Sequence, residues 1–511
     1  MDLMTLFQQW WQEVCISTLL NSFLISLLLL FSFFYLLKLT RGGELNLPPS
    51  PPKLPIIGNL HQLGTLLHRS LHILSNKYGP LLLLHMGNAP FLIVSSPEIA
   101  TELIKGRDTD FLNRPQIRAA NVLFCGCSDV AFCSYDDYWR QAKKLFIENL
   151  SQKRVQALQF VREEEVGEVV EKIRRSCMDG GAIDLSEICV AIAHTITCRA
   201  SFSKMYEGEE GSLSLGHLVR QAVDLIGAFC FEDLFPSLGW MDVLTGFSSR
   251  LRRTSRALHA ILDQIIEDHQ TNGDSDQSDD RDFLDILLCV QKNGMPGHDL
   301  TKENIKALIL DMFLGGTDST ATTMEWAMAE LVKNPRVMKR AQEEVRSVVG
   351  KKSKVDEADI EQMGYLKCTI KETLRLHPPF ILARKSSAPA KLEGYDIPAR
   401  TRILINNWAI QRDPKLWDKP GEFFPERFVS NPIDFKGQND KFFPFGMGPR
   451  SCPGISFAII GTEQVLANLL YWFDWELPEG AAGEDLDMSE VYGVAIRKKI
   501  PLRLVPVLHY P

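Results

Sequence analysis

Residues 445–454 read Phe-Gly-Met-Gly-Pro-Arg-Ser-Cys-Pro-Gly, and the chain is organised around them. Pro449 and Pro453 exclude a continuous helix and the glycines allow tight turns, so this stretch predicts a rigid, compact loop followed by a helix. The loop holds Cys452 two residues after Arg450 and just before that helix begins. A cation and a helix N-terminus both stabilise a thiolate, so Cys452 is a candidate metal ligand. A buried cysteine in a tight turn is the alternative.

The spacing of the loop favours the metal ligand. The pattern Phe-x-x-Gly-x-Arg-x-Cys-x-Gly resembles the haem-binding signature of the cytochrome P450 superfamily, in particular that of plant microsomal (A-type) members. The matching residues are Phe445, Gly448, Arg450, Cys452 and Gly454. The resemblance implies haem b, iron protoporphyrin IX, with the Cys452 sulfur as the axial ligand of the iron.

Composition limits the other possibilities. The chain has 511 residues, of which 45% are hydrophobic, so it can bury a large core. Its net charge of −8 argues against nucleic acid as the main partner. The 11 cysteines show no framework spacing, which fits a reducing compartment. Cys125, Cys127 and Cys133 lack a fourth ligand at the spacing of a zinc site.

An uncharged, apolar segment lies near the N-terminus. Residues 14–37 are long enough to span a bilayer, which takes about 20 residues. A secretory signal, the alternative, has a shorter apolar core behind a positive start. Asp2 and Glu13 precede the segment while Lys38 and Arg41 follow it, so the positive-inside rule places the body of the protein in the cytosol. We therefore expect a single-pass transmembrane helix in the endoplasmic reticulum membrane.

Four regions follow from this interpretation: a short lumenal N-terminus (1–13), an anchor (14–37), a basic, proline-rich hinge (38–55) and a haem-binding catalytic domain (56–511). The run from Leu47 to Pro55 contains too many prolines for a helix and predicts a stiff, extended arm. It resembles the hinge of plant microsomal P450 enzymes.

The fold class is mainly α with a small β-rich region. Amphipathic periodicity predicts helices over residues 155–175 and 248–269, and apolar runs on both sides of Gly87-Asn88-Ala89-Pro90 predict a hairpin. The resemblance implies the cytochrome P450 fold, with β structure near residues 80–95 and 396–405. It places the haem between a helix at Gly315 and the Cys452 loop.

Residues 301–334 predict one long helix, capped by Thr301 and ended by Asn334-Pro335. Gly315 and Gly316 lie in its middle, where each costs about 1 kcal/mol relative to alanine. Either another helix packs closely against them, or the missing side chains leave room for a ligand.

The residues after these glycines resemble the oxygen-activation motif of the family, in which an acid and an alcohol guide protons to dioxygen. Asp318 takes the position of the acid and Ser319 that of the alcohol, with Thr320 displaced by one residue. A serine hydroxyl donates and accepts hydrogen bonds, but it is less restricted in rotamer than threonine. The departure predicts less efficient coupling of electrons to product.

Glu372 and Arg375 stand at i and i+3 on a predicted helix. Spacing alone is compatible with a solvated salt bridge. The resemblance implies instead a buried structural triad with Arg427 that supports the Cys452 loop.

Cationic and aromatic residues are the candidates for holding the haem propionates. By resemblance, Trp139 and Lys143 contact them, with Arg450 and Arg384 completing the cradle. Lysine lacks the bidentate fork that arginine offers at the corresponding position of the family.

The resemblance also implies a substrate pocket with mostly apolar or aromatic walls. Its residues are Phe124, Phe229, Leu308, Met312, Gly315, Phe380, Ile381 and Val494.

The function implied is a haem-thiolate monooxygenase. It inserts one oxygen atom from O2 into a small apolar plant metabolite: a terpenoid, phenolic, alkaloid or amino-acid-derived compound. No dinucleotide fingerprint is evident in the chain, so electrons must come from elsewhere. The resemblance implies that they come from NADPH through a separate flavoprotein reductase. A basic cluster could dock the reductase; it comprises Arg140, Lys143, Lys144, Lys153 and Arg154. Two alternatives stay open: a haem-thiolate dehydratase or isomerase, for example one that dehydrates an aldoxime, and a non-catalytic haem sensor.

Overall fold

The computed structural model describes residues 45–106, 108–205, 214–272, 281–429, 433–435 and 440–510, together with scattered positions among the first 44. Two compact units are distinguished: Met1–Leu47 with Gly394–Asp396, and Pro48–Glu393 with Ile397–Pro511. The predicted lumenal segment (1–13) and anchor (14–37) lie largely outside the described residues. Among the residues that are described, no helix has both the length and the apolar character needed to cross a membrane.

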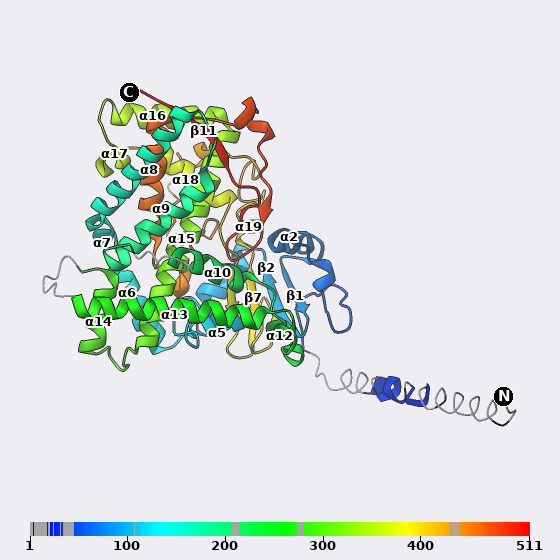
Figure 1. The fold of residues 1–511 in the computed structure, drawn as a ribbon. Coiled ribbons are helices and arrows are strands. Elements are labelled where there is room, and N and C mark those ends of the chain that lie inside the picture. The colour runs from blue at the N-terminus through cyan, green and yellow to red at the C-terminus, as the bar shows by residue number, and fades with distance from the viewer. Residues whose placement is uncertain are drawn as a thin grey trace. The chain divides into compact units, whose positions relative to one another are not determined.

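Helices form most of the larger unit (Figure 1). In its first half they are α2 (Leu67–Tyr78), α3 (Pro97–Thr101), α4 (Asp108–Phe111), α5 (Arg118–Leu123), α6 (Asp137–Asn149), α7 (Gln152–Ala157), α8 (Gln159–Asp179), α9 (Leu185–Phe202), α10 (Leu215–Gly227), α11 (Phe231–Leu234) and α12 (Met241–Leu244). In its second half they are α13 (Phe247–Asn272), α14 (Phe283–Asn293), α15 (Lys302–Lys333), α16 (Pro335–Val349), α17 (Glu357–Glu361), α18 (Gly364–Leu376), α19 (Asn407–Ile410) and α20 (Ile455–Trp472).

The strands are short. They are β1 (Leu81–Met86), β2 (Ala89–Val94), β3 (Ile183–Asp184), β4 (Leu382–Lys385), β5 (Ala390–Leu392), β6 (Tyr395–Ile397), β7 (Arg402–Ile405), β8 (Phe473–Glu476), β9 (Glu490–Val491), β10 (Arg497–Lys498) and β11 (Arg503–Leu508). The mainly helical fold class with a small β-rich region is confirmed.

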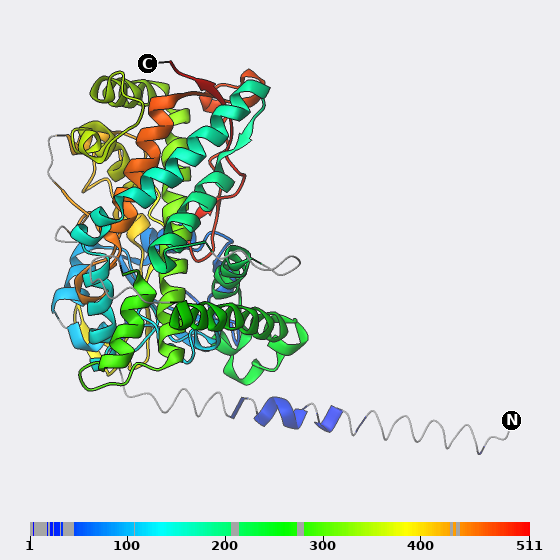
Figure 2. The same ribbon diagram turned by 60° about the vertical axis from the view of Figure 1, so that its left-hand side comes forward.

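Helix α15 is the centre of the helical part, where both views show it surrounded by other helices (Figures 1 and 2). It packs against α9, α18 and α20. Thr301 caps it as predicted, because the Thr301 hydroxyl accepts from the Asn304 N–H and the Asn304 side chain accepts from the Thr301 N–H. Most side chains of α15 are buried all round, which is the pattern of a core helix rather than of a surface helix.

A four-stranded sheet in the order β1-β2-β7-β4 forms the main β structure. The predicted hairpin is confirmed: β1 pairs with β2 antiparallel, with Leu82 opposite Ile93. β2 then pairs with β7 in parallel, which joins the two regions where β structure was expected. A small core that includes Leu71 and Leu84 packs α2 against this sheet.

The described part of the proline arm is extended and attached to the body of the larger unit. The Leu83 N–H donates to the Pro49 carbonyl at 2.8 Å, and the Asn59 amide donates to the Pro51 and Pro52 carbonyls at 3.3 Å. From Pro48 onward the predicted hinge therefore covers the edge of β1.

The predicted helix over residues 155–175 is interrupted. Leu158 ends α7 and precedes α8, with a ψ of 15°. The helix predicted over residues 248–269 is confirmed as α13.

Candidate functional site

The Cys452 loop is a compact turn. The Cys452 N–H donates to the Phe445 carbonyl at 2.9 Å, which closes the loop across its base. Gly446 and Gly448 have φ values of 78° and 68°, a left-handed conformation that favours glycine. A side chain at Gly448 would also collide with Ile104, since its Cβ would lie 2.6 Å from the Ile104 methyl carbon. The two glycines therefore allow the turn that presents the sulfur.

The sulfur itself has few polar partners. Cys452 Sγ accepts from the Gly454 N–H at 3.3 Å. Burial raises the pKa of the Cys452 thiol, while the Gly454 N–H and the Lys143 ammonium lower it in part. The nearby cation is thus Lys143, whereas the sequence pointed to Arg450. A buried thiol of this kind is deprotonated outright when it binds a metal, so its environment suits an iron ligand.

Arg450 points away from the sulfur. Its guanidinium donates to the carbonyls of Leu112, Val130 and Cys133 at 2.9, 3.1 and 2.6 Å. It also stacks on the Trp139 ring, 4.2 Å from the ring centroid. Arg450 therefore ties the Cys452 loop to the segments before and after α5.

Lys143 and Trp139 lie beside the loop, on α6. Lys143 Nζ donates to the Ser451 carbonyl at 2.8 Å and to the Pro449 carbonyl, and Trp139 Nε1 donates to the Val130 carbonyl at 3.0 Å. Lys143 is buried, so it does not belong to a surface docking cluster as the sequence indicated.

A group of buried cations surrounds this side of the loop. Burial lowers the pKa of Lys143 to about 8, that of Arg450 to about 9 and that of Arg114 to about 10. Burial also lowers the pKa of Arg384, to well below its usual value. Their mutual repulsion contributes to these shifts. Such crowding is costly without anions to offset it.

Arg384 shows which group fits here. Its side chain is only 1% exposed, and its Nε and Nη2 form no hydrogen bond within the described part of the chain. Nη1 donates to the Ala383 carbonyl at 2.9 Å, and Arg114 Nη1 donates to the same oxygen at 2.6 Å. Buried cationic donors without partners require an anion, and the two carboxylates of a haem fit that requirement. The sequence had no signal for Arg114.

The two glycines of α15 serve different purposes. A Cβ on Gly316 would lie 2.8 Å from Thr197 Oγ1 of α9 and 3.6 Å from the Phe457 ring of α20, so Gly316 permits close helix packing. A Cβ on Gly315 would meet nothing within 4 Å, and Gly315 is exposed although it lies halfway along a core helix. Close helix packing is therefore found at Gly316 and open space at Gly315, so each alternative left open by the sequence applies to one of the two glycines.

Ser319 lies on the open face of α15. It follows Gly315 by four residues, and its hydroxyl donates to the Gly315 carbonyl at 2.7 Å. Thr320 follows Gly316 instead, so it lies on the packed face, where its buried hydroxyl has no hydrogen-bond partner among the described residues. The alcohol nearest the open space is thus the serine.

The Asp318 side chain points toward neither the open face nor the packed face of α15, but toward β10. Its Oδ1 lies 3.7 Å from Arg497 Nη1 of β10, and Oδ2 has no hydrogen-bond partner in the described structure. Burial raises the pKa of the Asp318 carboxyl, Arg497 lowers it and Asp224 raises it. Arg497 is a residue that the sequence did not single out, because it lies 179 positions away and only folding brings it close.

Glu372, Arg375 and Arg427 come together as expected. Arg375 donates two parallel bonds of 2.8 Å to the Glu372 carboxylate, and Arg427 Nε donates to Glu372 Oε1 at 3.0 Å. Glu372 and Arg375 are fully buried. Gln411 extends this group, since its amide donates to the Arg375 carbonyl and its Oε1 accepts from the Phe443 N–H, both at 3.2 Å. The triad is thereby linked to the approach of the Cys452 loop.

The predicted pocket residues fall into groups that each lie together. Leu308, Met312 and Gly315 share one face of α15 through their spacing of four and three residues. The Ile496 N–H donates to the Pro379 carbonyl at 2.8 Å, which places the segment of Val494 beside that of Phe380 and Ile381. Phe124 is buried and packs on Phe132, with ring centroids 5.6 Å apart.

Phe229 differs from the other pocket residues. It follows the end of α10, is 53% exposed and packs edge-on against the Phe231 ring. Its place in the wall therefore stays a prediction.

The sequence comparisons agree with this geometry. The cytochrome P450 family model matches residues 48–503. The chain is a cytochrome P450. It is 52% identical over 460 residues to cytochrome P450 71A1 of Persea americana, covering 88% of this chain and 91% of that protein. It is 45% identical over 527 residues to phenylacetaldehyde oxime monooxygenase CYP71AN24 of Prunus mume, covering 100% of both chains.

The fold is that of the same family. A zebra fish cytochrome P450 solved with abiraterone superposes with a TM-score of 0.73 at 26% identity, covering 86% of this chain and 99% of that one. Enzymes of this family are haem b monooxygenases that receive electrons from NADPH through a reductase. In this P450, Cys452 would hold the iron, and the buried cations Arg384 and Arg114, which keep unpaired donors, would hold the propionates.

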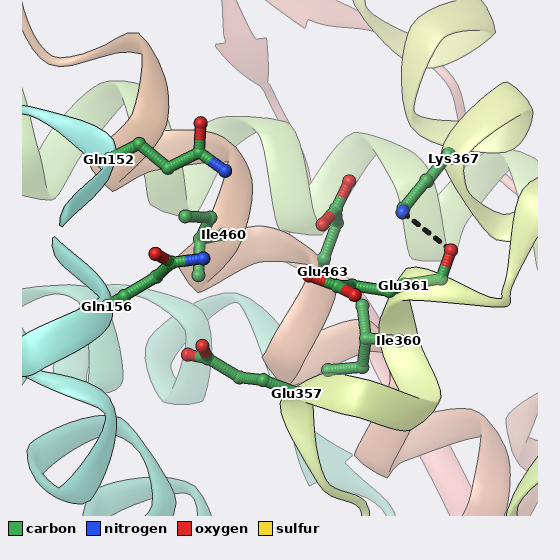
Figure 3. A pocket seen from close by; sticks show the side chains of 8 residues that line it. All are labelled: Gln152, Gln156, Glu357, Ile360, Glu361, Lys367, Ile460 and Glu463. Atoms are coloured by element: carbon green, nitrogen blue, oxygen red, sulfur yellow. Dashed lines mark hydrogen bonds between the residues drawn. The ribbon is translucent and has the colours of Figure 1, made fainter.

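A small hollow of this P450 lies between helices, and its lining side chains point toward one another (Figure 3). It has a volume of about 150 Å³, and helices α7, α17, α18 and α20 line it. Its lining residues are Gln152, Gln156, Glu357, Ile360, Glu361, Lys367, Ile460 and Glu463. Burial raises the pKa of Glu463 to about 7. With mostly polar and charged walls, this hollow is unsuited to an apolar substrate.

Proposed function

We propose that this monooxygenase acts on small, largely apolar plant metabolites that carry a phenyl ring, with amino-acid-derived aldoximes among the candidates. The observation that supports the proposal most directly is the open space at Gly315 beside the Ser319 hydroxyl, on a helix whose neighbouring Leu308 and Met312 are apolar. The name of the Prunus mume relative, an oxime monooxygenase, supports the aldoxime class.

The chain's own residues would divide the work as follows. Haem, when bound, supplies the reductive activation of dioxygen, and thiolate ligation favours O–O cleavage. Ser319 holds a hydroxyl at the open face of α15, where it can donate to an oxygen-bearing ligand or to a water. The Asp318 carboxyl lies one residue away, and burial raises its pKa, which favours its taking up and releasing a proton.

The triad of Glu372, Arg375 and Arg427 does not contact the substrate and instead supports the Cys452 loop. Glu372 pairs with both Arg375 and Arg427, whose remaining N–H groups donate to backbone carbonyls. Gln411 links this group to the residues before the Cys452 loop. We assign these residues to the scaffold.

A flavoprotein reductase would dock near the Cys452 side of the molecule. The exposed cations there are Arg140, Lys144, Lys153 and the half-buried Arg154. Arg140 pairs with Asp137, and Lys144 lies 3.7 Å from Glu148, so part of this charge is already offset. An acidic partner surface would compete with those exposed pairs at little cost.

For location, the apolar segment 14–37 and the charges that follow it support a single-pass anchor in the endoplasmic reticulum membrane with the catalytic domain in the cytosol. The domain organisation is then 1–13 lumenal, 14–37 anchor, 38–55 hinge and 56–511 catalytic. Extraction of microsomes with alkaline carbonate tests the anchor, since release of the chain into the supernatant would contradict it.

Reconstitution with a plant reductase, NADPH and a panel of aryl aldoximes, phenolics, terpenoids and alkaloids tests the activity. We expect a product heavier by one oxygen atom from at least one phenyl-bearing compound, and no product from Cys452→Ser. Turnover restricted to non-aromatic terpenoids would contradict the substrate class.

Aldoxime dehydration is the second candidate reaction. The oxime monooxygenase relative makes the substrate class plausible for either outcome. A nitrile formed without reductase or dioxygen would establish dehydration, whereas a product that requires both establishes oxygen insertion.

A further inference from the structure

Two buried carboxyls are in contact where the segment between α5 and α6 (residues 124–136) meets α15. Asp129 of this segment is fully buried, and its Oδ1 has no donor among the residues that the structure describes. A hydrogen bond joins the Asp129 carboxyl to that of Asp311 on α15. Two ionised carboxylates offer only acceptors, so this contact requires one proton shared by the pair.

The same two carboxyls hold backbone N–H groups of the segment. The Phe132 N–H donates to Asp129 Oδ2 at 2.8 Å. The Val130 N–H donates to Asp311 Oδ2, whereas the Val130 carbonyl accepts from Arg450 at 3.1 Å. Asp311 is therefore a tie between the α5–α6 segment and α15, separate from the tie to the Cys452 loop.

This tie lies beside the predicted substrate pocket. Asp311 precedes Met312 and lies four residues before Gly315, so it shares the face of α15 on which the open space lies. The segment that Asp311 holds carries Phe132, whose ring packs on that of Phe124 with centroids 5.6 Å apart. Phe124 is a predicted pocket residue, so the position of the segment affects the shape of that pocket.

The surroundings of the pair favour retention of the proton. Burial raises the pKa of both carboxyls, and the negative charge of Asp129 raises the pKa of Asp311 further. Arg450 lowers the pKa of Asp129 and Arg114 also faces it, but burial is the larger effect. Three further titratable groups near the pair are uncharged at neutral pH, because burial raises their pKa values. They are the thiols of Cys127 and Cys133 and the phenol of Tyr138.

We propose that Asp129 and Asp311 share a single proton and act as a positioning pair, which holds the α5–α6 segment against α15 at the edge of the substrate pocket. Because the pKa values are raised in the folded protein, the contact is present at low pH and is lost as the pH rises through them. Two buried negative charges then face each other, so the segment moves away from α15 and the substrate is bound less tightly. The link to substrate binding rests on the proposed function, whereas the shared proton does not.

The test uses the full-length holoenzyme at pH values between about 6 and about 9.5. Hydrogen–deuterium exchange, corrected for the intrinsic effect of pH on exchange, is followed in peptides that cover residues 124–136. Spectral titration with ethylbenzene, a phenyl-bearing compound without a titratable group, measures binding in the pocket. We expect the protection of these peptides and the affinity for ethylbenzene each to fall about tenfold across this range.

Two neutral replacements test the pair from both sides. Asp311→Asn and Asp129→Asn each keep one acceptor oxygen and supply an N–H donor in place of the shared proton. Both variants should keep high protection and tight binding over the whole pH range. Asp311→Ala removes the contact and should give low protection and weak binding at every pH.

Glu325→Gln is the matched control. Glu325 is a second buried carboxyl on α15, it accepts from the Ser186 hydroxyl, and burial raises its pKa as well. Its neutral replacement changes the net charge equally and should keep the pH dependence of the natural chain. The carbon monoxide difference spectrum of each variant checks that the haem site is intact.

The outcomes are distinct. Protection that does not depend on pH in the natural chain, or a pH dependence that persists in both asparagine variants, overturns the shared proton. Protection that follows the proton while the affinity for ethylbenzene stays constant overturns the positioning role. If ethylbenzene binds at no pH while protection still follows the proton, the proposed preference for phenyl-bearing substrates is contradicted and the shared proton is supported.

Discussion

The guanidinium of Arg497 bridges Asp318 and Asp224, lying 3.7 Å from the first carboxylate and 3.4 Å from the second. The three side chains come from β10, α15 and α10. They are 31, 14 and 61% exposed in that order, so the bridge leads from the surface to the buried acid. Arg497 is therefore placed to set the charge state of Asp318.

This bridge predicts a shift in pH dependence. Arg497→Gln removes the cation that lowers the pKa of Asp318, so that pKa rises further and the limb of the pH–rate profile that reports Asp318 moves to higher pH. Asp318→Asn should abolish that limb and reduce product formation by about 10²-fold or more. Arg497→Lys keeps the charge and should restore most of the original profile. An unchanged profile in Arg497→Gln would contradict the role of the bridge.

The position of Ser319 predicts how electrons are coupled to product. Ser319→Ala removes the hydroxyl from the open face of α15, so NADPH consumption should continue while product per NADPH falls about tenfold. Ser319→Thr should raise coupling above that of the natural chain, because a β-branched side chain is held in fewer rotamers. The matched change Thr320→Ala, on the packed face, should leave coupling unaltered. If Thr320→Ala alone uncouples the enzyme, the assignment of the two hydroxyls is reversed.

The two glycines of α15 predict opposite responses to alanine. Gly316→Ala should lower the free energy of unfolding by about 1–3 kcal/mol, because the added methyl group would collide with Thr197 Oγ1. That oxygen is buried and donates to the Ala193 carbonyl at 2.8 Å, so it has little freedom to move. Gly315→Ala should raise stability by about 1 kcal/mol through helix propensity while weakening substrate binding. Calorimetry and spectral substrate titrations measure both. Equal effects of the two substitutions would contradict the difference in packing.

Glu463 predicts a pH-dependent stability. Its pKa is raised by burial from 4.5 to about 7, so the folded state favours the protonated form. The contribution of Glu463 to the free energy of unfolding is then fully present below about pH 4.5. This contribution, roughly 3 kcal/mol, is lost as the pH rises through about 7. Glu463→Gln should raise Tm at about pH 8 and leave it unchanged at about pH 4. The exposed Glu361→Gln, in the same hollow, is the control and should change Tm little at either pH.

Local sequence patterns predicted the parts of the site that are close in the chain. The glycines and prolines around Cys452 determine its turn, and the i, i+3 spacing of Glu372 and Arg375 places their charges together. Arg114, Gln411 and Arg497 gave no such signal, because their partners are reached only through the packing of distant segments. For the same reason, the cation beside the sulfur is not the one expected: the neighbour in sequence, Arg450, donates to backbone carbonyls, whereas Lys143 from α6 lies near the sulfur.

The attachment of the proline arm to β1 has a practical consequence. The Pro49 carbonyl accepts from the Leu83 N–H, which holds the arm against the edge of the sheet. A force applied to the chain upstream of Pro48 therefore acts on that edge and not on a flexible linker. Shortened versions of the enzyme that start at residue 48 keep the hydrogen bond between Pro49 and Leu83 at the edge of the sheet. Versions that start after Pro52 lose the partner of the Leu83 N–H, and this uncovered part of the strand invites self-association.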